Sequence, residues 1–145
     1  MLSALPYRIR DKNRFEMVHA TLDMPQMWGY IFDRFTATAS MSYQLTRTCF
    51  FGHTHLPEVY DKAIDIEDSG GVDEVELKPG HKYLINIGSV GQPRDGDPRA
   101  AFVTFDVEKH LVTMHRVDYD IESCQERIRE AGLPDRLAER LAYGR

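Results

Sequence analysis

Residues 50–57, with the sequence FFGHTHLP, constrain the fold of this chain more strongly than any other stretch. The run RTCFF at 47–51 reads as the end of a buried strand, and Gly52 lets the backbone leave that strand. Pro57, which closes the stretch, restricts the backbone conformation where the chain leaves the loop. The stretch therefore predicts a buried strand followed by a specified loop, with His53 and His55 at the carboxyl edge of the strand.

Three histidines follow predicted buried strands, at the positions where loops gather to build sites. His53 and His55 follow the run above, and His19 lies near the end of the segment 15–20. Neutral imidazole is a common ligand for divalent first-row ions, so three converging rings would hold one zinc ion or share two metals. Two alternatives stay open: half-exposed loop histidines at 53 and 55, and a strand-end histidine bonded to backbone at 19.

Alternation of apolar and polar residues predicts most of the other strands. These segments are 58–66, 72–77, 82–87, 101–107 and 111–117. The last two are joined by residues 108–110, a connection short enough for a hairpin. Residues 67–71 are expected to form a turn or an exposed loop, and residues 1–14 carry no strong periodic pattern beyond a turn at 11–13.

Large apolar residues at helical spacing predict a helix over 27–35 whose aromatic stripe lies in the core. Residues 36–45 read as the tail of that helix and a loop, or as a second weak helix. Near the C-terminus the pattern predicts a helix over 120–132, capped by Asp120 and ended by Gly132, and a shorter one over 135–143. Strands with helices at both ends predict an α/β (layered α+β) fold, with residues 1–145 as a single or partial domain.

Composition narrows the classes of function. A length of 145 residues is that of one domain, and no apolar run approaches the roughly 20 residues that span a bilayer. The net charge of −5 argues against general nucleic-acid binding, although metal ions would still allow a phosphorylated substrate. Cys49 and Cys124 have no disulfide-framework spacing, and the N-terminus has no secretory pattern, so we expect reduced thiols in a cytoplasmic protein.

Three segments together resemble a known family: Val18-His19-Ala20, FFGHTHLP at 50–57, and INIGSVGQPRDGDPRAAFVTFD at 85–106. They are similar to the C-terminal part of a calcineurin-like metallophosphoesterase, in its small bacterial and archaeal phosphodiesterase branch. The resemblance implies the C-terminal part of an αββα double β-sandwich, with mostly antiparallel or mixed strands and two C-terminal helices. It covers nearly the whole chain.

The resemblance also implies a chemistry. Two divalent ions (manganese, zinc, iron or nickel) would activate a water molecule that hydrolyses a phosphodiester or phosphomonoester. On that template His19 and His53 bind one ion and His55 binds the other. In the loop at 88–99, Arg94 and Arg99 are candidate contacts for the substrate phosphate, and Ser89 or Gln92 could hydrogen-bond it. The alternative is that this loop packs against the histidine loop and that its arginines pair with acids such as Asp95 and Asp97.

The sequence departs from the family in one respect. The family's remaining ligands lie in Asp-x-His, Gly-Asp-x-x-Asp and Gly-Asn-His motifs N-terminal to the matching part, and this sequence has none of them. Two dications facing three neutral rings would repel each other without compensation. We therefore expect a C-terminal fragment, a split-gene product or a degenerate paralogue, with at most one metal ion bound to this chain alone.

Two readings of the function remain in competition. In the first, the chain is part of a hydrolase that needs its missing N-terminal half, or another protomer, to act on a phosphate ester. In the second, it is a non-catalytic domain with a mononuclear site of His19, His53 and His55, or with a purely structural or assembly role. Sheet edges left open by a missing half would predict a homo-oligomer or a rearranged fold.

Overall fold

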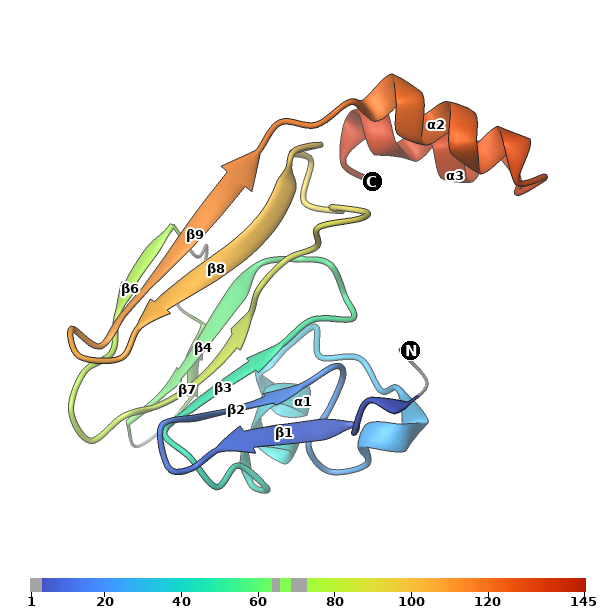
Figure 1. The fold of residues 1–145 in the computed structure, drawn as a ribbon. Helices are drawn as coiled ribbons and strands as arrows, with labels where there is room; N and C mark the ends of the chain where they lie inside the picture. The colour runs from blue at the N-terminus through green and yellow to red at the C-terminus, as the bar shows by residue number, and fades with distance from the viewer. Residues whose placement is uncertain (1–3, 64–65, 69–72) are drawn as a thin grey trace.

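Two facing β-sheets form the body of the molecule in the computed structural model, which describes residues 4–63, 66–68 and 73–145 (Figure 1). The larger sheet contains, in spatial order, β1 (Arg8–Asp11), β2 (Phe15–Val18), β3 (Thr48–Phe51), β7 (Lys82–Asn86), β4 (Glu58–Lys62) and β5 (Ile66–Asp68). The smaller, antiparallel sheet contains β6 (Glu74–Glu76), β9 (Leu111–Val117) and β8 (Ala100–Asp106). The predicted α/β class is confirmed, with a mixed sheet and a second antiparallel one.

The centre of the larger sheet is parallel: β2 pairs with β3, and β3 pairs with β7. All four residues of β3 are buried, as expected for a parallel strand covered on both faces. Because these three strands run in the same direction, their carboxyl ends meet at one edge of the sheet. The loops that follow β2, β3 and β7 therefore start side by side.

Each face of the larger sheet has its own hydrophobic core. On one face, side chains of β2, β3, β4 and β7 pack against Ile31 and against α1 (Arg34–Met41). On the other face, Phe50, Val59 and Ile85 pack against residues of the smaller sheet such as Val112. Full burial of one such aliphatic side chain stabilises the fold by about 1.5–3 kcal/mol.

The helix predicted over 27–35 is wrong in position. The structure has a short 3₁₀ helix at Pro25–Met27, no helix over 28–33, and α1 only from Arg34. Asp33 starts α1 because its side chain accepts the N–H of Thr36 at 2.8 Å. In return, the hydroxyl oxygen of Thr36 accepts the N–H of Asp33. The expected core stripe is wrong as well, since Trp28 and Phe35 are 47% and 83% exposed.

An N-terminal strand without a clear sequence pattern completes the larger sheet. β1 pairs with β2 in an antiparallel hairpin around residues 12–14. The carboxylate of Glu16 is fully buried and holds this hairpin in place: it pairs with Arg8 and accepts the backbone N–H of Leu45 at 2.8 Å. A buried charge is tolerated only when it is paired and hydrogen-bonded in this way.

The remaining predicted elements are largely confirmed. α2 (Ile121–Glu130) is capped by Asp120, and α3 (Asp135–Glu139) continues into a 3₁₀ turn at Arg140–Tyr143. The predicted strand over 58–66 ends at Lys62, and β5 takes up part of the loop expected at 67–71; residues 64–65 and 69–72 lie outside the described part of the chain. Within the described part, no helix has the length and apolar character to cross a bilayer.

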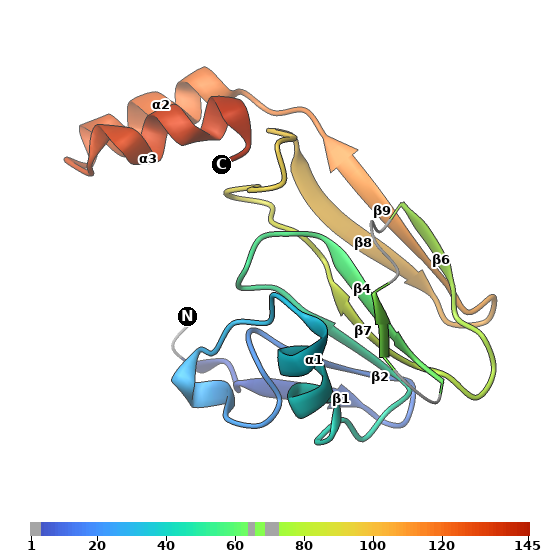
Figure 2. The same ribbon diagram turned by 180° about the vertical axis from the view of Figure 1, so that it is seen from behind.

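The C-terminal helices form a pair beyond the carboxyl end of β9, as both ribbon views show (Figures 1 and 2). The end of the chain returns to the sheet edge that carries the histidines. There the N–H of Gly96 donates to the carbonyl oxygen of Gly144 at 3.0 Å. The loop after β7 is thus held between the histidine loop and the C-terminus.

Candidate metal centre

His19, His53 and His55 lie together at the carboxyl edge of the parallel strands, around a cavity of about 260 Å³. His19 directly follows β2, and the other two lie in the loop after β3. The N–H of Gly52 donates to the carbonyl oxygen of His19 at 3.1 Å and ties the two strand ends together. The predicted convergence of these strand ends is therefore present in the structure.

His19 and His53 form a close pair. The Nε2 atom of His19 lies 3.1 Å from the Nδ1 atom of His53. Two nitrogen ligands at about 2.0–2.1 Å from one tetrahedral ion would be about 3.3 Å apart. The observed separation suits two ligands of one ion, and it also suits a hydrogen bond between two neutral rings.

His55 is oriented by a backbone group rather than by another histidine. Its Nδ1 atom lies 2.7 Å from the carbonyl oxygen of Gln92. A carbonyl only accepts, so Nδ1 carries the proton and the lone pair is on Nε2. This is the arrangement in which metal-ligating histidines are usually held, with the second ring nitrogen fixed by a backbone or carboxylate oxygen.

Two of the three rings are kept neutral by their surroundings. Partial burial lowers the pKa of His19 below its usual value, and the neighbouring His53 and His55 rings lower it further. Partial burial also lowers the pKa of His55; the hydrogen bond to Gln92 opposes this effect and the charge of Arg94 adds to it. Neutral imidazole is the form that binds metal, so both effects favour ligation at neutral pH.

The histidine loop has a strained backbone. His53 and His55 have φ angles of 65° and 64°, in the left-handed region that non-glycine residues rarely adopt. Such a conformation costs about 1–3 kcal/mol per residue and persists only where the surroundings impose it. Residues of this kind concentrate at functional sites.

Asn86, at the end of β7, imposes the shape of this loop. Its side chain is 1% exposed and donates from Nδ2 to the carbonyl oxygen of Gly52 at 3.0 Å and to Oγ1 of Thr54 at 2.7 Å. Its Oδ1 accepts the N–H of Gly88 at 3.0 Å. The sequence reading gave Asn86 no role, although an amide side chain at the end of an otherwise apolar strand was a signal for one.

The loop after β7 packs directly on the histidine loop. Gly88 has a φ of +73°, and a Cβ atom there would lie 2.9 Å from Cβ of Ala101 and 3.1 Å from Cγ of Pro57. The alternative that these loops pack together is therefore confirmed. Only glycine gives both the backbone angle and the space that this contact needs.

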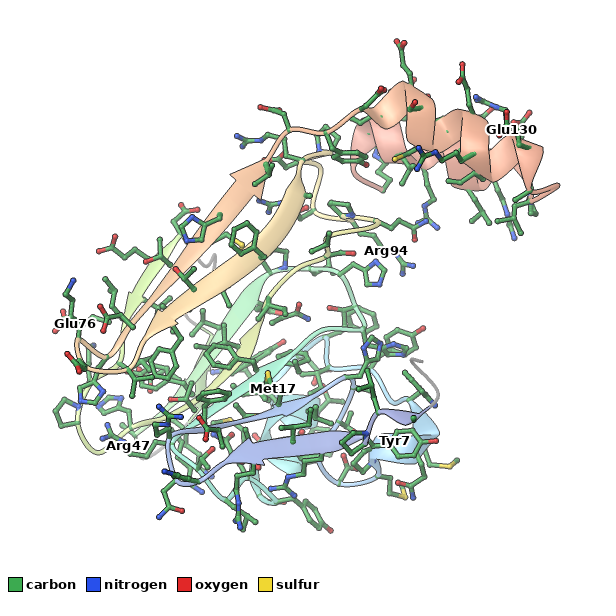
Figure 3. All side chains as sticks on the ribbon, viewed as in Figure 1. Tyr7, Met17, Arg47, Glu76, Arg94 and Glu130 are labelled. Carbon is green, nitrogen blue, oxygen red and sulfur yellow. The ribbon has the colours of Figure 1, made fainter. Side chains whose placement is uncertain are left out.

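The two arginines of this loop differ in their surroundings. Arg99 pairs with Asp97 at 2.6 Å, as one alternative predicted, whereas Asp95 pairs with Arg116. Arg94, labelled in Figure 3, donates to Oε1 of Gln92 at 2.9 Å, and within the described residues it has no carboxylate in ion-pair range. Arg94 thus keeps a positive charge near His55 that no neighbouring acid neutralises.

Aromatic rings surround the histidine pair. The ring of Tyr30 stacks on that of His53, with centroids 4.3 Å apart, and the ring of Trp28 meets His19 edge to face at 5.0 Å. Both aromatic side chains are about half exposed. The sequence reading placed Trp28 in the core, because the large residues at 27, 28, 31, 32 and 35 imitate a buried helix face, and it gave Tyr30 no role.

The donors present fit part of a metal site. The ring nitrogens of His19 and His53 are at ligating separation, and in the described part of the chain no three or more His, Cys, Asp or Glu side chains are grouped as metal ligands. The other histidines with side-chain partners are engaged elsewhere: His81 bonds to Asp61 and His115 to Thr104. Neither was given a functional role from the sequence.

Several known proteins are similar to this chain in sequence or in fold. No protein-family model matches the chain. An uncharacterized protein of Methanocaldococcus jannaschii is 35% identical over 147 residues, which cover 99% of this chain and 58% of that protein. A hypothetical protein of Pyrococcus horikoshii has a TM-score of 0.71 at 20% identity, covering 99% of this chain and 53% of that one, and this similarity supports the fold alone.

A solved metallophosphoesterase from Sphaerobacter thermophilus is similar in both sequence and structure. It is 38% identical, has a TM-score of 0.87 and matches 99% of this chain. The match covers 60% of that protein, so this chain spans rather more than half the length of its relatives. The resemblance noted in the sequence is thereby confirmed: the chain has the sequence pattern and the fold of part of a metallophosphoesterase.

Proposed function

We propose that this chain forms part of a metal-dependent phosphoesterase and supplies the histidine side of its metal centre. The observation that carries the proposal is the 3.1 Å approach of His19 Nε2 to His53 Nδ1 at the edge where three parallel strands end. The similarity to the Sphaerobacter metallophosphoesterase supports it. The reaction would be the hydrolysis of a phosphodiester or a phosphomonoester.

In this proposal some residues bind the metal ions, some position the histidine rings, and one contacts the phosphate. His19 and His53 bind one ion and His55 binds a second, with manganese, zinc, iron or nickel as candidate metals. Such ions supply a water molecule activated for attack and positive charge that stabilises the phosphate. Asn86 and Gln92 position the rings, and Arg94 meets a phosphate oxygen with its unneutralised guanidinium.

The carboxylates that would allow two ions to sit together come, in this proposal, from outside this chain. Their source is the region that makes up the other two fifths or so of the relatives, in the same protein or in a partner. The chain alone would then bind at most one ion and would not hydrolyse substrate. The two free cysteines support a reducing, cytoplasmic setting.

Metal binding tests the proposal directly. Trp28 is the sole tryptophan, and its ring lies 5.0 Å from that of His19, so we expect zinc or manganese to change its fluorescence. His53→Ala should abolish the change, whereas His110→Ala, in the turn between β8 and β9, should preserve it. A wild-type chain that binds no metal, alone or with the complementary region, would overturn the proposal.

Hydrolysis of a bis-aryl phosphodiester with manganese gives the second readout. We expect no turnover by the chain alone, and turnover that depends on His53 once the complementary region is added. Turnover by the chain alone, lost in His53→Ala, would show that the absent carboxylates are not needed.

A non-catalytic domain with a mononuclear site is the second candidate, favoured by the His19–His53 separation, which a single ion satisfies. One zinc ion per chain, without turnover even in the complemented protein, would select it.

A further inference from the structure

Three exposed aromatic rings, which we call the aromatic patch, lie on the segment between β2 and α1. Trp28 and Tyr30 are about half exposed and Phe32 is 58% exposed, whereas Ile31 is only 1% exposed and belongs to the core. Residues 29–32 form neither helix nor strand, and in an extended chain alternate side chains point to opposite sides. The segment is therefore anchored by Ile31 and presents the three rings on its other side.

The patch begins at the metal-binding edge and leads away from it. The ring of Tyr30 stacks on that of His53, and the ring of Phe32 stacks on that of Tyr30 with centroids 5.3 Å apart and an angle of 7° between the planes. Carbon atoms in contact lie about 3.5–4.0 Å apart, so the Tyr30 and Phe32 rings are offset sideways by about 4 Å. An offset stack leaves part of each ring face uncovered.

Trp28 extends the patch to the other histidine of the pair. Its ring lies 5.0 Å from that of His19 and 5.8 Å from that of His53, measured between centroids. The same side chain lines a groove of about 700 Å³ that reaches His19. Each member of the histidine pair thus has an exposed aromatic ring beside it.

The backbone holds these rings in position at a conformational cost. Trp28 has a φ of 54°, in the left-handed region where a bulky residue is an outlier. Gly29 packs so closely on Thr21 that a Cβ atom there would lie 3.1 Å from Cγ2 of Thr21. Strain of this kind persists only where the surroundings impose it, and it concentrates at active sites and ligand-binding sites. The exposure of the rings is therefore specified by the fold.

We propose that the aromatic patch binds a flat aromatic group of the phosphate ester, such as a nucleobase, while the phosphate lies at the metal centre. Uncovered aromatic faces bind planar rings by stacking, whatever the sequence of polar groups on the ring edge. This inference rests on the proposed function and names the class of its substrate, an aromatic or nucleoside ester of phosphate.

The charges around the histidines give such an ester one orientation. Arg94 accompanies His55, since its N–H donates to the carbonyl oxygen of His55 at 3.3 Å. The rings of the patch accompany His19 and His53 instead. The guanidinium attracts the phosphate, and the aromatic faces attract the apolar ring, so the two ends of the ester are distinguished.

The test compares two esters that share a phosphate: adenosine 5′-monophosphate, and ribose 5-phosphate, which lacks the base. By calorimetry on the zinc-loaded protein, we expect the nucleotide to bind about tenfold or more tightly, as expected for one base stacked on aromatic side chains. Phe32→Ala should remove most of this preference. Phe35→Ala is the matched control, because Phe35 is 83% exposed at the start of α1 and has no place in the patch, and it should keep the preference.

A second pair of variants separates the ring from its bulk. Tyr30→Phe keeps the ring and should retain the preference for the nucleotide, whereas Tyr30→Leu keeps an apolar side chain without a ring and should lose it. If Phe32→Ala does not fold, this pair decides alone.

Adenosine, which has no phosphate, tests the patch without the metal centre. In a chelating buffer it should shift the ring proton signals of Trp28, Tyr30 and Phe32 in nuclear magnetic resonance spectra, and Phe35→Ala should not alter those shifts. Failure of the metal centre would leave this binding intact. The proposed function and the present inference therefore fail separately.

Several results would overturn the inference: equal affinity for the nucleotide and ribose 5-phosphate, a preference unchanged in both Phe32→Ala and Tyr30→Leu, or the same loss in Phe35→Ala. Loss of the preference once the complementary region is added would show that the rings are an assembly surface instead, and would also overturn it. Phenyl phosphate against methyl phosphate separates the two sources of a flat ring. A preference in that pair without one for the nucleotide would support the patch and assign it to a simple aryl ester.

Discussion

At the scale of single residues, the site depends on side chains that shape the backbone as much as on those that would bind metal. Gly52, His53 and His55 were readable from the sequence because they form one contiguous stretch. The role of Asn86 was not readable, since its partners Gly52 and Thr54 lie 34 and 32 residues away. A local pattern predicts a loop, but it does not predict what holds the loop.

Asn86→Ala should lower the free energy of unfolding by about 2–3 kcal/mol, because it leaves buried loop groups without partners. Urea unfolding measures the change. Asn13→Ala, at an exposed turn position, is the control and should alter stability by no more than about 0.5 kcal/mol. Equal effects of the two substitutions would contradict the role assigned to Asn86.

Gly88→Ala should destabilise the fold by about 2–4 kcal/mol, because it adds left-handed strain to a close contact with Ala101 and Pro57. Gly91→Ala is the matched control: a Cβ atom at Gly91 meets nothing within 4 Å. We expect that control to be neutral or slightly stabilising in thermal unfolding. A tolerated Gly88→Ala would mean that the two loops are not packed as described.

The lowered pKa of His19 and His55 predicts how the stability of the metal-free chain depends on pH. The unfolded chain takes up protons below about pH 6.5, before the folded chain does, so stability is full above that pH and falls as the pH drops further. Thermal unfolding in a chelating buffer between pH 8 and 5 measures this loss. His55→Asn, which tolerates the left-handed backbone, should make the loss smaller; an unchanged profile would contradict the assignment.

At the scale of elements, strands were predicted better than helices. Strand alternation is a local consequence of burial on one face, and it identified β8 and β9. The helix misplaced at 27–35 had the right spacing of large residues, yet Trp28 has a φ of 54° and leaves the helical region. The capping pair of Asp33 and Thr36 fixes the true start of α1, and the sequence reading did not use it.

Asp33→Ala should lower the free energy of unfolding by about 1 kcal/mol through loss of the N-terminal cap of α1. Asp33→Asn keeps an acceptor at the same position and should stay close to wild type. Denaturant unfolding of both variants gives the comparison. If the alanine and asparagine variants are equally unstable, the effect comes from the charge and not from the cap.

At the scale of the whole molecule, the layered class followed from the order of the elements, but the strand order did not. β3 pairs with β7 in parallel across more than thirty residues, and alternation does not identify partners. The contact of the C-terminus with the loop after β7 was equally hidden. Gly144 packs so closely that a Cβ atom there would lie 2.7 Å from the backbone of Asp97.

Gly144→Ala should release the C-terminus from this loop and speed amide exchange at Gly96, whose N–H bonds to Gly144. Gly132→Ala shares the positive φ but meets nothing within 4 Å, so it should leave the Gly96 amide unchanged. The two sheets should remain intact in both variants by circular dichroism. Unaltered exchange at Gly96 in Gly144→Ala would contradict the docking of the chain end.

The left-handed angles of His53 and His55 have a consequence for how this loop changes over evolution. A side chain at either position must tolerate φ near +65°, which favours asparagine, aspartate or glycine as replacements and disfavours β-branched residues. Drift away from histidine would therefore pass first through residues that keep the loop's shape. A descendant with other residues at these two positions would still carry the same loop shape in its backbone.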